Sequence, residues 1–420
     1  VNLYNWNIRM TEKTLQNCGK CGLCLNTCPV YKILKEEQVS PRAKLQLIKA
    51  YDNNTLASSP LLKEIVSKCL MCGSCAANCP SGIDHYSKFM EMRRKMVETQ
   101  GETPAIKSLI YLLAREYRIK LGAGLARPGQ KFVPDSFARD YKLGNIPLKN
   151  FPKLNCTPLR KANDEIILSN KKQVGTVVYF TGCATNYLYD DTGFATIEIL
   201  KHMGYKIIIP KDQTCCSIPL LFHGATDKAF KNIMTNINAL KDHDCDAILV
   251  DCSTCGEALK NEYPRLLENQ GKNPFDAKAI STKVIDILSF VDQNFDRLEF
   301  DPDFTEKLSV TYHAPCHTKN TFHSHIIAET LLEKLPFVSY KRTIDVEECC
   351  GGGGTFFYEY PELSKKMVDK KIKNAKAVQA KLWLTDCPVC RMNLAGNLNN
   401  NDNLQVLHPV SLIHSVLKPA

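Results

Sequence analysis

The sequence predicts a mixed fold in which a cysteine-rich helical domain precedes two tandem domains built from βαβ units. Two nearly identical four-cysteine runs lie within the first 80 residues, and a longer cysteine pattern occurs twice in the last 250 residues, about 134 residues apart. With 420 residues and 44% hydrophobic composition, the chain is large enough for several ordinary cores. We divide it into an N-terminal domain (1–101), a helical connector (102–172) and two α/β domains (173–298 and 299–420).

Eight cysteines form the two N-terminal runs "CGKCGLCLNTCP" and "CLMCGSCAANCP", both with the spacing C-x2-C-x2-C-x3-C-P. This spacing is typical of bacterial ferredoxins with two 4Fe–4S cubes, in which three cysteines of one run and the fourth of the other bind each cube. Zinc ribbons are the alternative, but their C-x2-C pairs are separated by a longer gap. The expected ligands are Cys18, Cys21, Cys24 and Cys79 for the first cluster, and Cys69, Cys72, Cys75 and Cys28 for the second.

Local signals fit a helical N-terminal domain. Gly22 and Gly73 permit tight turns beside a cube, and a proline ends each run. The stretch "SPRAKLQLIKAY" predicts a helix with Ser40 as its N-cap and Pro41 at its first position. In the connector, apolar residues at helical spacing from Ile106 to Tyr117 predict a helix over 105–121 that packs between domains.

A second cysteine pattern occurs twice in the last 250 residues. Cys183, Cys215, Cys216, Cys252 and Cys255 are followed, at offsets of 133 to 135 residues, by Cys316, Cys349, Cys350, Cys387 and Cys390. Three gaps reproduced this closely indicate a tandem duplication. Each copy supplies one sulfur more than a cube needs, so a five-sulfur cluster would have a bridging or shared ligand.

The adjacent pair Cys349 and Cys350 is unsuited to a disulfide, because neighbouring Cα atoms lie about 3.8 Å apart and bridged cysteines prefer about 5.5–6 Å. The two sulfurs, carried on one turn, can instead reach the same metal cluster. The four glycines of "CCGGGG" clear space and leave N–H groups that can point at cluster sulfur.

Four short β-rich runs end just before cysteines of this pattern. They are "VGTVVYF" before Cys183, "AILVD" before Cys252, "LSVTYH" before Cys316 and "AKLWLTD" before Cys387. Helical patterns such as "TGFATIEILKHMG" follow, which indicates βαβ units. Ligands of open α/β sheets gather beyond the carboxyl ends of the strands, where these cysteines are expected.

With these residues in place, the C-terminal half resembles the cysteine-rich CCG-domain proteins. They include the catalytic subunit of heterodisulfide reductase and the iron–sulfur subunits of glycolate oxidase, lactate-utilisation systems and anaerobic glycerol-3-phosphate dehydrogenase. The motifs "YHAPCH" and "CCGGGGTF" carry the resemblance, and the layout of a two-cluster ferredoxin-like domain before two such repeats extends it over almost the whole chain.

The resemblance implies two cubane 4Fe–4S clusters and one or two further noncubane 4Fe–4S clusters, with iron held through the cysteines. It assigns Cys183, Cys215, Cys216, Cys252 and Cys255 to a third cluster, and Cys316, Cys349, Cys350, Cys387 and Cys390 to a fourth. Ser217 departs from the family motif, since a serine follows the first cysteine pair where a glycine follows the second. We therefore expect the fourth cluster more firmly than the third.

Other residues offer weaker signals. His313 and His317 flank Cys316 and are candidate proton donors, although they could instead cap the strand end and hydrogen-bond cluster sulfur. His223, His323 and His325 carry no spacing signal. Cys156 and Cys245 lie outside every repeat and are expected to be small buried thiols.

The chain lacks the glycine-rich signatures of dinucleotide and triphosphate sites, so a flavoprotein dehydrogenase subunit carrying FAD is the expected partner. The predicted function is an iron–sulfur, electron-transferring oxidoreductase subunit that serves oxidation of a 2-hydroxy acid such as glycolate or lactate, or of glycerol 3-phosphate. Electrons would pass to a quinone or another carrier. The alternative is a heterodisulfide-reductase-type subunit that cleaves a disulfide.

The net charge of +10 comes from the N-terminal part, where residues 1–150 hold 23 Lys and Arg against 12 Asp and Glu. A basic surface fits nucleic acid, an anionic membrane or an acidic protein, and it also compensates anionic clusters. A nucleic-acid enzyme would not need four cluster sites, so no nucleic-acid partner is expected. No signal peptide and no charge-free run of 18 apolar residues is recognised, which predicts a reducing cytoplasmic location with possible peripheral membrane contact.

Overall fold

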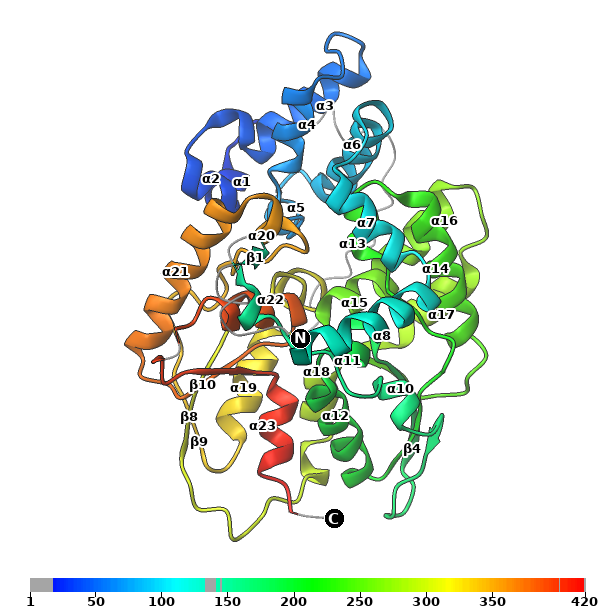
Figure 1. Cartoon of the computed structure of the whole chain (residues 1–420), viewed down its shortest axis with the longest axis vertical. Helices are drawn as coiled ribbons and strands as arrows, with labels where there is room; N and C mark the ends of the chain where they lie inside the picture. The colour runs from blue at the N-terminus through cyan, green and yellow to red at the C-terminus, as the bar shows by residue number, and fades with distance from the viewer. Residues whose placement is uncertain (1–17, 133–140, 144–145, 400, 419–420) are drawn as a thin grey trace. The chain divides into compact units, whose positions relative to one another are not determined.

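The computed structural model describes residues 18–132, 141–143, 146–399 and 401–418. The chain forms two compact units, Val1–Gly101 and Glu102–Ala420. The predicted fold class is confirmed, because the described part of the first unit is helical and the second unit contains two α/β domains with parallel sheets (Figure 1).

Short helices joined by tight turns make up the first unit. They are α1 (Leu23–Thr27), α2 (Pro29–Leu34), α3 (Pro41–Asp52), α4 (Pro60–Ser67), α5 (Ser74–Ala77) and α6 (His85–Gln100). The Ser40 hydroxyl accepts the Ala43 N–H at 3.1 Å and so caps α3, as its sequence predicts. Gly22 and Gly73 stand in the left-handed conformation directly before α1 and α5, with φ of 84° and 74°. That conformation lets the chain turn sharply next to Cys21 and Cys72.

The first α/β domain has a sheet with the order β3-β5-β4-β6-β7. Its strands are β3 (Ile166–Ile167), β4 (Gly175–Phe180), β5 (Tyr205–Ile208), β6 (Ala247–Val250) and β7 (Val284–Asp286). β3 is antiparallel to β5, and the other four strands are parallel. The connecting helices are α11 (Gly182–Tyr187), α12 (Asp190–His202), α13 (Ile218–Phe222), α14 (Thr226–Leu240), α15 (Ser253–Glu257), α16 (Tyr263–Asn269), α17 (Phe275–Lys283) and α18 (Ile287–Gln293).

The second α/β domain repeats this topology with the parallel order β11-β10-β8-β9. Its strands are β8 (Leu308–Tyr312), β9 (Val338–Tyr340), β10 (Leu382–Leu384) and β11 (Gln405–Leu407). Its helices are α19 (His325–Lys334), α20 (Phe356–Glu359), α21 (Pro361–Ala377), α22 (Pro388–Gly396) and α23 (Pro409–Ser415). Strands β9, β8, β10 and β11 therefore correspond to β5, β4, β6 and β7, as the duplicated cysteine spacing implies.

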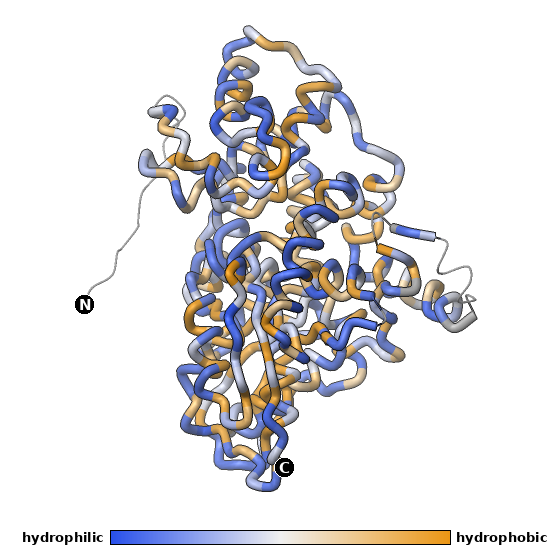
Figure 2. Tube along the Cα trace, turned by 90° about the vertical axis from the view of Figure 1, so that its left-hand side faces the viewer, coloured by the Kyte–Doolittle hydropathy of each residue, from blue (hydrophilic) through white to orange (hydrophobic). Residues whose placement is uncertain are grey.

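The two α/β domains share one hydrophobic core. In the first domain α12 packs against α23 of the second, and in the second domain α19 packs against α18 of the first. Because α12 corresponds to α19 and α18 to α23, the two contacts are equivalent under the duplication. Buried side chains from both sheets and from all four helices belong to one continuous cluster. Hydrophobic and hydrophilic stretches alternate along the helices in Figure 2, as expected for elements with one face on such a core.

The region between the N-terminal unit and the first sheet departs from the predicted single helix over 105–121. It forms two helices, α7 (Pro104–Leu113) and α8 (Glu116–Phe132), with a break at Ala114–Arg115. Ile106 and Ile110 are buried, but Tyr117 is exposed. The Arg118 guanidinium lies 3.7 Å from the centre of the Tyr111 ring, across the break. The region also holds β1 (Lys142–Leu143), β2 (Ile146–Pro147), α10 (Leu159–Ala162) and the edge strand β3.

Within the described ranges, no helix combines the length and the hydropathy that crossing a bilayer requires.

We predict that Leu412→Ala lowers the free energy of unfolding by about 2–5 kcal/mol, because Leu412 is buried on α23 in the shared core. Anaerobic urea unfolding followed by circular dichroism measures this change. The exposed neighbour His414 provides the control His414→Ala, which is expected to leave stability nearly unchanged. Equal stabilities for the two variants would show that α23 does not hold the first domain.

Candidate metal centres

The two five-cysteine sets lie at the carboxyl ends of three neighbouring strands in each α/β domain. In the first domain Cys183 follows β4, the pair Cys215 and Cys216 follows β5, and Cys252 follows β6. The corresponding loops after β8, β9 and β10 carry the second set. None of the twenty cysteines, all of which lie within the described ranges, is joined in a disulfide, and this includes the adjacent pairs. The parallel topology thus brings together cysteines that are far apart in sequence.

Within each set, the second cysteine of the adjacent pair occupies the centre. A hydrogen bond from Cys215 and a smaller contribution from Cys255 lower the pKa of Cys216 to about 5. Hydrogen bonds from Cys349 and then Cys390 likewise hold the pKa of Cys350 below its ordinary value. Each central sulfur is buried. The two sets therefore present the same local arrangement, with a thiolate acceptor surrounded by sulfur neighbours.

The two sets meet through a pair of corresponding residues, Cys252 and Cys387. Hydrogen bonding to Cys252 is the largest cause that lowers the pKa of Cys387, so the two thiols are neighbours. The residues beside them are joined directly, because the Ser253 N–H donates to the Asp386 carbonyl oxygen at 3.4 Å. The Thr254 hydroxyl of the first domain also lies 3.8 Å from the Cys387 sulfur. In turn, the His317 Nδ1 of the second domain lies 3.0 Å from that hydroxyl. The ten cysteines thus belong to one continuous region where the two domains face each other.

Ser217 preserves the geometry that glycine has in the second set. Its φ of 75° is close to the 83° of Gly351, in the left-handed region. The backbone N–H of Ser217 lies 3.4 Å from the Cys215 sulfur, and that of Gly351 lies 3.4 Å from the Cys349 sulfur. The serine therefore does not displace the loop. A Cβ at Gly351 would instead lie 2.8 Å from the Ser364 carbonyl oxygen, so glycine is required only in the second set.

Two buried hydrogen-bonded triads support the cysteine-bearing strand ends. Tyr179 and Thr185 donate to the Asp251 carboxylate beside Cys252. The corresponding Tyr312 and Thr318 donate to Asp386 beside Cys387. Burial raises the pKa of Asp251 to about 6 and that of Asp386 to about 7.

The sequence interpretation did not identify these six residues. Their signal is present in the sequence, because they recur at the same offsets as the cysteines, 133 for Tyr and Thr and 135 for Asp. Aligning the two repeats in full would have found them.

His313 stands apart from its counterpart in the first domain. It is 1% exposed, and by geometry neither ring nitrogen has a hydrogen-bond partner among the described residues. The imidazole is nevertheless near enough to help lower the pKa of Cys350, after the larger effects of Cys349 and Cys390. One ring nitrogen and the sulfurs of Cys350 and Cys390 all lie within 4.8 Å of one another. The corresponding residue of the first repeat, one position after Tyr179, is the buried Phe180.

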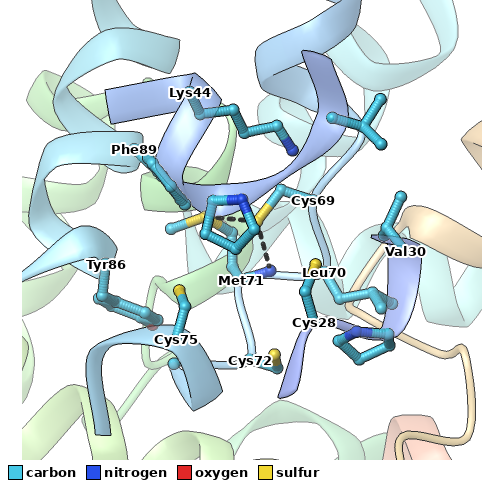
Figure 3. A pocket seen from close by; sticks show the side chains of 14 residues that line it. Cys28, Val30, Lys44, Cys69, Leu70, Met71, Cys72, Cys75, Tyr86 and Phe89 are labelled. Carbon is cyan, nitrogen blue, oxygen red and sulfur yellow. Dashed lines mark hydrogen bonds between the residues drawn. The ribbon is translucent and has the colours of Figure 1, made fainter. Parts of the chain in front are cut away.

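In the first unit, four cysteines predicted to share a cluster surround one pocket. Cys28, Cys69, Cys72 and Cys75 line it, together with apolar side chains and Lys44 (Figure 3). The Met71 N–H lies 3.4 Å from the Cys69 sulfur, and the Tyr31 N–H lies 3.5 Å from the Cys28 sulfur. Lys44 is buried and donates to the Lys68 carbonyl oxygen at 2.5 Å.

The other predicted quartet is partly gathered by the described contacts. Cys18 and Cys21 lie close enough to Cys24 for their charges to raise its pKa, after the larger effect of burial. Cys79 follows α5, and α5 packs beside α1, which carries Cys24.

Both kinds of site fit an iron–sulfur cluster. Burial raises the pKa of Cys28 to about 12 and also raises that of Cys72, so a bound cation is needed to keep these sulfurs ionised. Backbone N–H groups face the sulfurs, as is usual around such clusters. The donor sets are sulfur only, and iron–sulfur clusters are held by cysteine thiolates.

The prediction of a buried thiol is wrong for Cys156, which is exposed because the turn that carries it lies at the surface. The same prediction is confirmed for Cys245, which is buried. His223 is buried, and its Nε2 lies 2.6 Å from the Thr355 hydroxyl. His325 Nε2 lies 3.9 Å from a Glu347 oxygen.

Comparison with known proteins gives a consistent result. A cysteine-rich domain model named CCG matches residues 177–260 and 310–395, and a 4Fe-4S dicluster domain model matches residues 14–83. The chain is 27% identical over 404 residues to a probable glycolate oxidase iron-sulfur subunit of Bacillus subtilis, covering 92% of this chain and 89% of that protein. It is 24% identical to the glycolate oxidase iron-sulfur subunit of Escherichia coli, with 97% and 95% covered.

A third relative is named as a subunit of a different enzyme. It is one of the subunits of the dihydromethanophenazine:CoB--CoM heterodisulfide reductase of Methanosarcina mazei, 26% identical over 415 residues, with 93% of this chain and 90% of that protein covered.

We predict that Lys44→Met shifts the midpoint potential of one ferredoxin-type signal to more negative values, because a buried positive charge beside the quartet favours the reduced, more negative state. A redox titration followed by electron paramagnetic resonance measures the shift. Lys49, exposed on the same helix, supplies the control Lys49→Met, which is expected to have little effect. Identical potentials in both variants would remove Lys44 from the surroundings of the cluster.

Proposed function

This chain is a CCG-domain iron–sulfur oxidoreductase subunit, and we propose that it conducts electrons within a multi-subunit, flavin-dependent dehydrogenase. The oxidised substrate would be a 2-hydroxy acid such as glycolate or lactate, or glycerol 3-phosphate. The flavin, expected as FAD, belongs to a partner subunit, and a quinone or another carrier is the proposed acceptor.

The observation that carries this proposal is the close approach of the two five-cysteine sets at Cys252 and Cys387, where the Thr254 hydroxyl lies 3.8 Å from the Cys387 sulfur. Two quartets and two five-cysteine sets in one chain supply the donors for a series of clusters, and this close approach gives the last two sets a short connection. The clusters, when bound, supply one-electron chemistry. The chain's own part is to hold the sulfurs, exclude water from them and aim N–H groups at them.

The proposed cluster ligands are those predicted from the sequence. Cys18, Cys21, Cys24 and Cys79 would hold one cube, and Cys69, Cys72, Cys75 and Cys28 the other, in line with the pocket that the last four surround. Both five-cysteine sets are proposed to bind clusters, since Ser217 keeps the loop geometry of Gly351.

A second candidate function is reduction of a disulfide, as the name of the Methanosarcina relative states for that protein. Two observations favour it. Cys316 and Cys349 of the second set are partly exposed, so a small molecule could approach that set. His313 and His317 lie in its surroundings and are the candidate proton donors.

Contact with an anionic membrane surface is proposed for α7 and α8. Tyr111, Tyr117, Leu121 and Leu125 are exposed there, beside the basic Arg118 and Lys120. Exposed apolar and aromatic side chains flanked by cations suit the headgroup region of an anionic bilayer.

We expect Cys350→Ala to remove the paramagnetic signal of the second five-cysteine set while the ferredoxin-type signals persist, because only that set loses its central sulfur. Electron paramagnetic resonance on anaerobically purified protein tests this. The exposed Cys156 offers the control Cys156→Ser, which is expected to retain every signal. An unchanged spectrum for Cys350→Ala would take Cys350 off the ligand list.

Purification of the native complex decides between the two functions. The electron-transfer role predicts a co-purifying flavoprotein, identified by mass spectrometry, and reduction of the chain's clusters when the substrate of that flavoprotein is added. Activity of the isolated chain on small disulfides, with a strong chemical reductant as electron source, would instead favour the alternative. Material that binds no iron when prepared anaerobically would contradict both.

A further inference from the structure

The two five-cysteine sets have the same sulfur arrangement but different polar surroundings. His313 takes the position of Phe180, as described above. A second difference concerns helices α14 and α21, which align through Ala229 and Ser364, because the carbonyl oxygen of each faces the residue after the cysteine pair. In that alignment Lys371 takes the position of Asn236.

Lys371 is a buried cation close to the second pair. It is 2% exposed and donates to the Asp345 carbonyl oxygen. Burial lowers its pKa, but the charges of Asp345, Cys350 and Cys349 oppose that effect, so the second pair is close enough to act on the ammonium group. The neutral Asn236 instead donates to the Cys215 carbonyl oxygen at 3.1 Å. The lysine beside the second pair thus replaces an asparagine beside the first, and its Nζ lies 3.8 Å from an Asp345 carboxylate oxygen. The first set has its own buried cation, Arg160, whose charge acts on Cys183.

The groups around His313 leave one acceptor for its ring N–H. A buried imidazole always has at least one N–H, and leaving it without an acceptor is unfavourable. The Cys350 and Cys390 sulfurs are within 4.8 Å of a ring nitrogen, and no other described acceptor bonds to the ring. Backbone hydrogen bonds fix the residue, because the His313 N–H donates to the Leu384 carbonyl oxygen at 2.8 Å. A thiolate at Cys350 is the acceptor that this ring lacks.

We propose that His313 donates a ring N–H to the Cys350 sulfur, and that this contact, absent from the first set, gives the second set the higher reduction potential of the pair. Hydrogen bonds to ligand sulfur stabilise the reduced state, since they offset the added negative charge. An electron shared between the sets is then held at the second one, with no bond or proton changing place. The inference rests on the proposed function, because it presumes iron in both sets.

The contact is tested on the complete protein, purified anaerobically with 15N-labelled histidine. Pulsed electron paramagnetic resonance on the signal that Cys350→Ala removes should detect a weak 15N coupling, and His313→Phe should abolish it. His317 is labelled as well, so a coupling that persists in His313→Phe would assign the nitrogen to another histidine and overturn the proposal. A coupling as strong as that of a directly bound nitrogen, or none in the unmodified sequence, would also overturn it.

A redox titration provides the second measurement. His313→Phe copies the residue of the first set and should shift the second-set midpoint to more negative values, towards that of the first set. His313→Gln keeps an N–H donor and should shift it less, whereas His414→Phe, at an exposed site on α23, should not shift it. If the second-set midpoint of all three variants equals that of the unmodified protein, the proposal is overturned. If His313→Phe does not fold, the 15N measurement on the unmodified sequence and His313→Gln still decide the question.

The proposed function and the role of His313 are contradicted by different outcomes. Protein without iron in the second set would contradict the proposed function. Protein with a second-set signal but without a histidine coupling would contradict only the role of His313.

Discussion

The convergence of cysteines at the carboxyl ends of parallel strands is the constraint on which this structure depends. Sulfurs separated by up to 74 residues must reach one small volume, and the order β5-β4-β6, repeated as β9-β8-β10, places their loops side by side. Hydrogen bonding to the neighbouring thiolates, and then burial, raises the pKa of Cys255 and Cys390, so a bound cation would be needed to keep all five sulfurs of a set ionised together. The fold therefore creates a strong demand for metal at two adjacent positions.

Much of this arrangement was predictable because its signals are local or periodic. Strand ends before Cys252 and Cys387, the Ser40 cap and the duplication all follow from short stretches of sequence. The break at Ala114–Arg115 was not predicted, because the apolar spacing continues through it. The close approach of Cys252 to Cys387 was also beyond sequence reasoning, since it depends on how two domains pack. Spacing within one repeat holds no information about that packing.

Duplication followed by divergence explains why the two five-cysteine sets share a backbone but not a chemical environment. The triads of Tyr, Asp and Thr are retained in both copies, because they hold the strand ends that carry the cysteines. Ser217 and Gly351 keep one conformation with different side chains. Phe180 and His313 occupy corresponding positions with different side chains, as do Asn236 and Lys371. Those positions are free to set the electrostatics of each copy separately.

The exchange of helix contacts between the two α/β domains has a consequence for biosynthesis. Helix α12 finds its packing partner in α23, more than 200 residues later in the chain. While the ribosome still holds that distant segment, the first domain lacks part of its core and its cysteine set remains accessible. Metal delivery to both copies is thus expected as a single late event, after synthesis has passed α23, rather than as two successive insertions on the growing polypeptide.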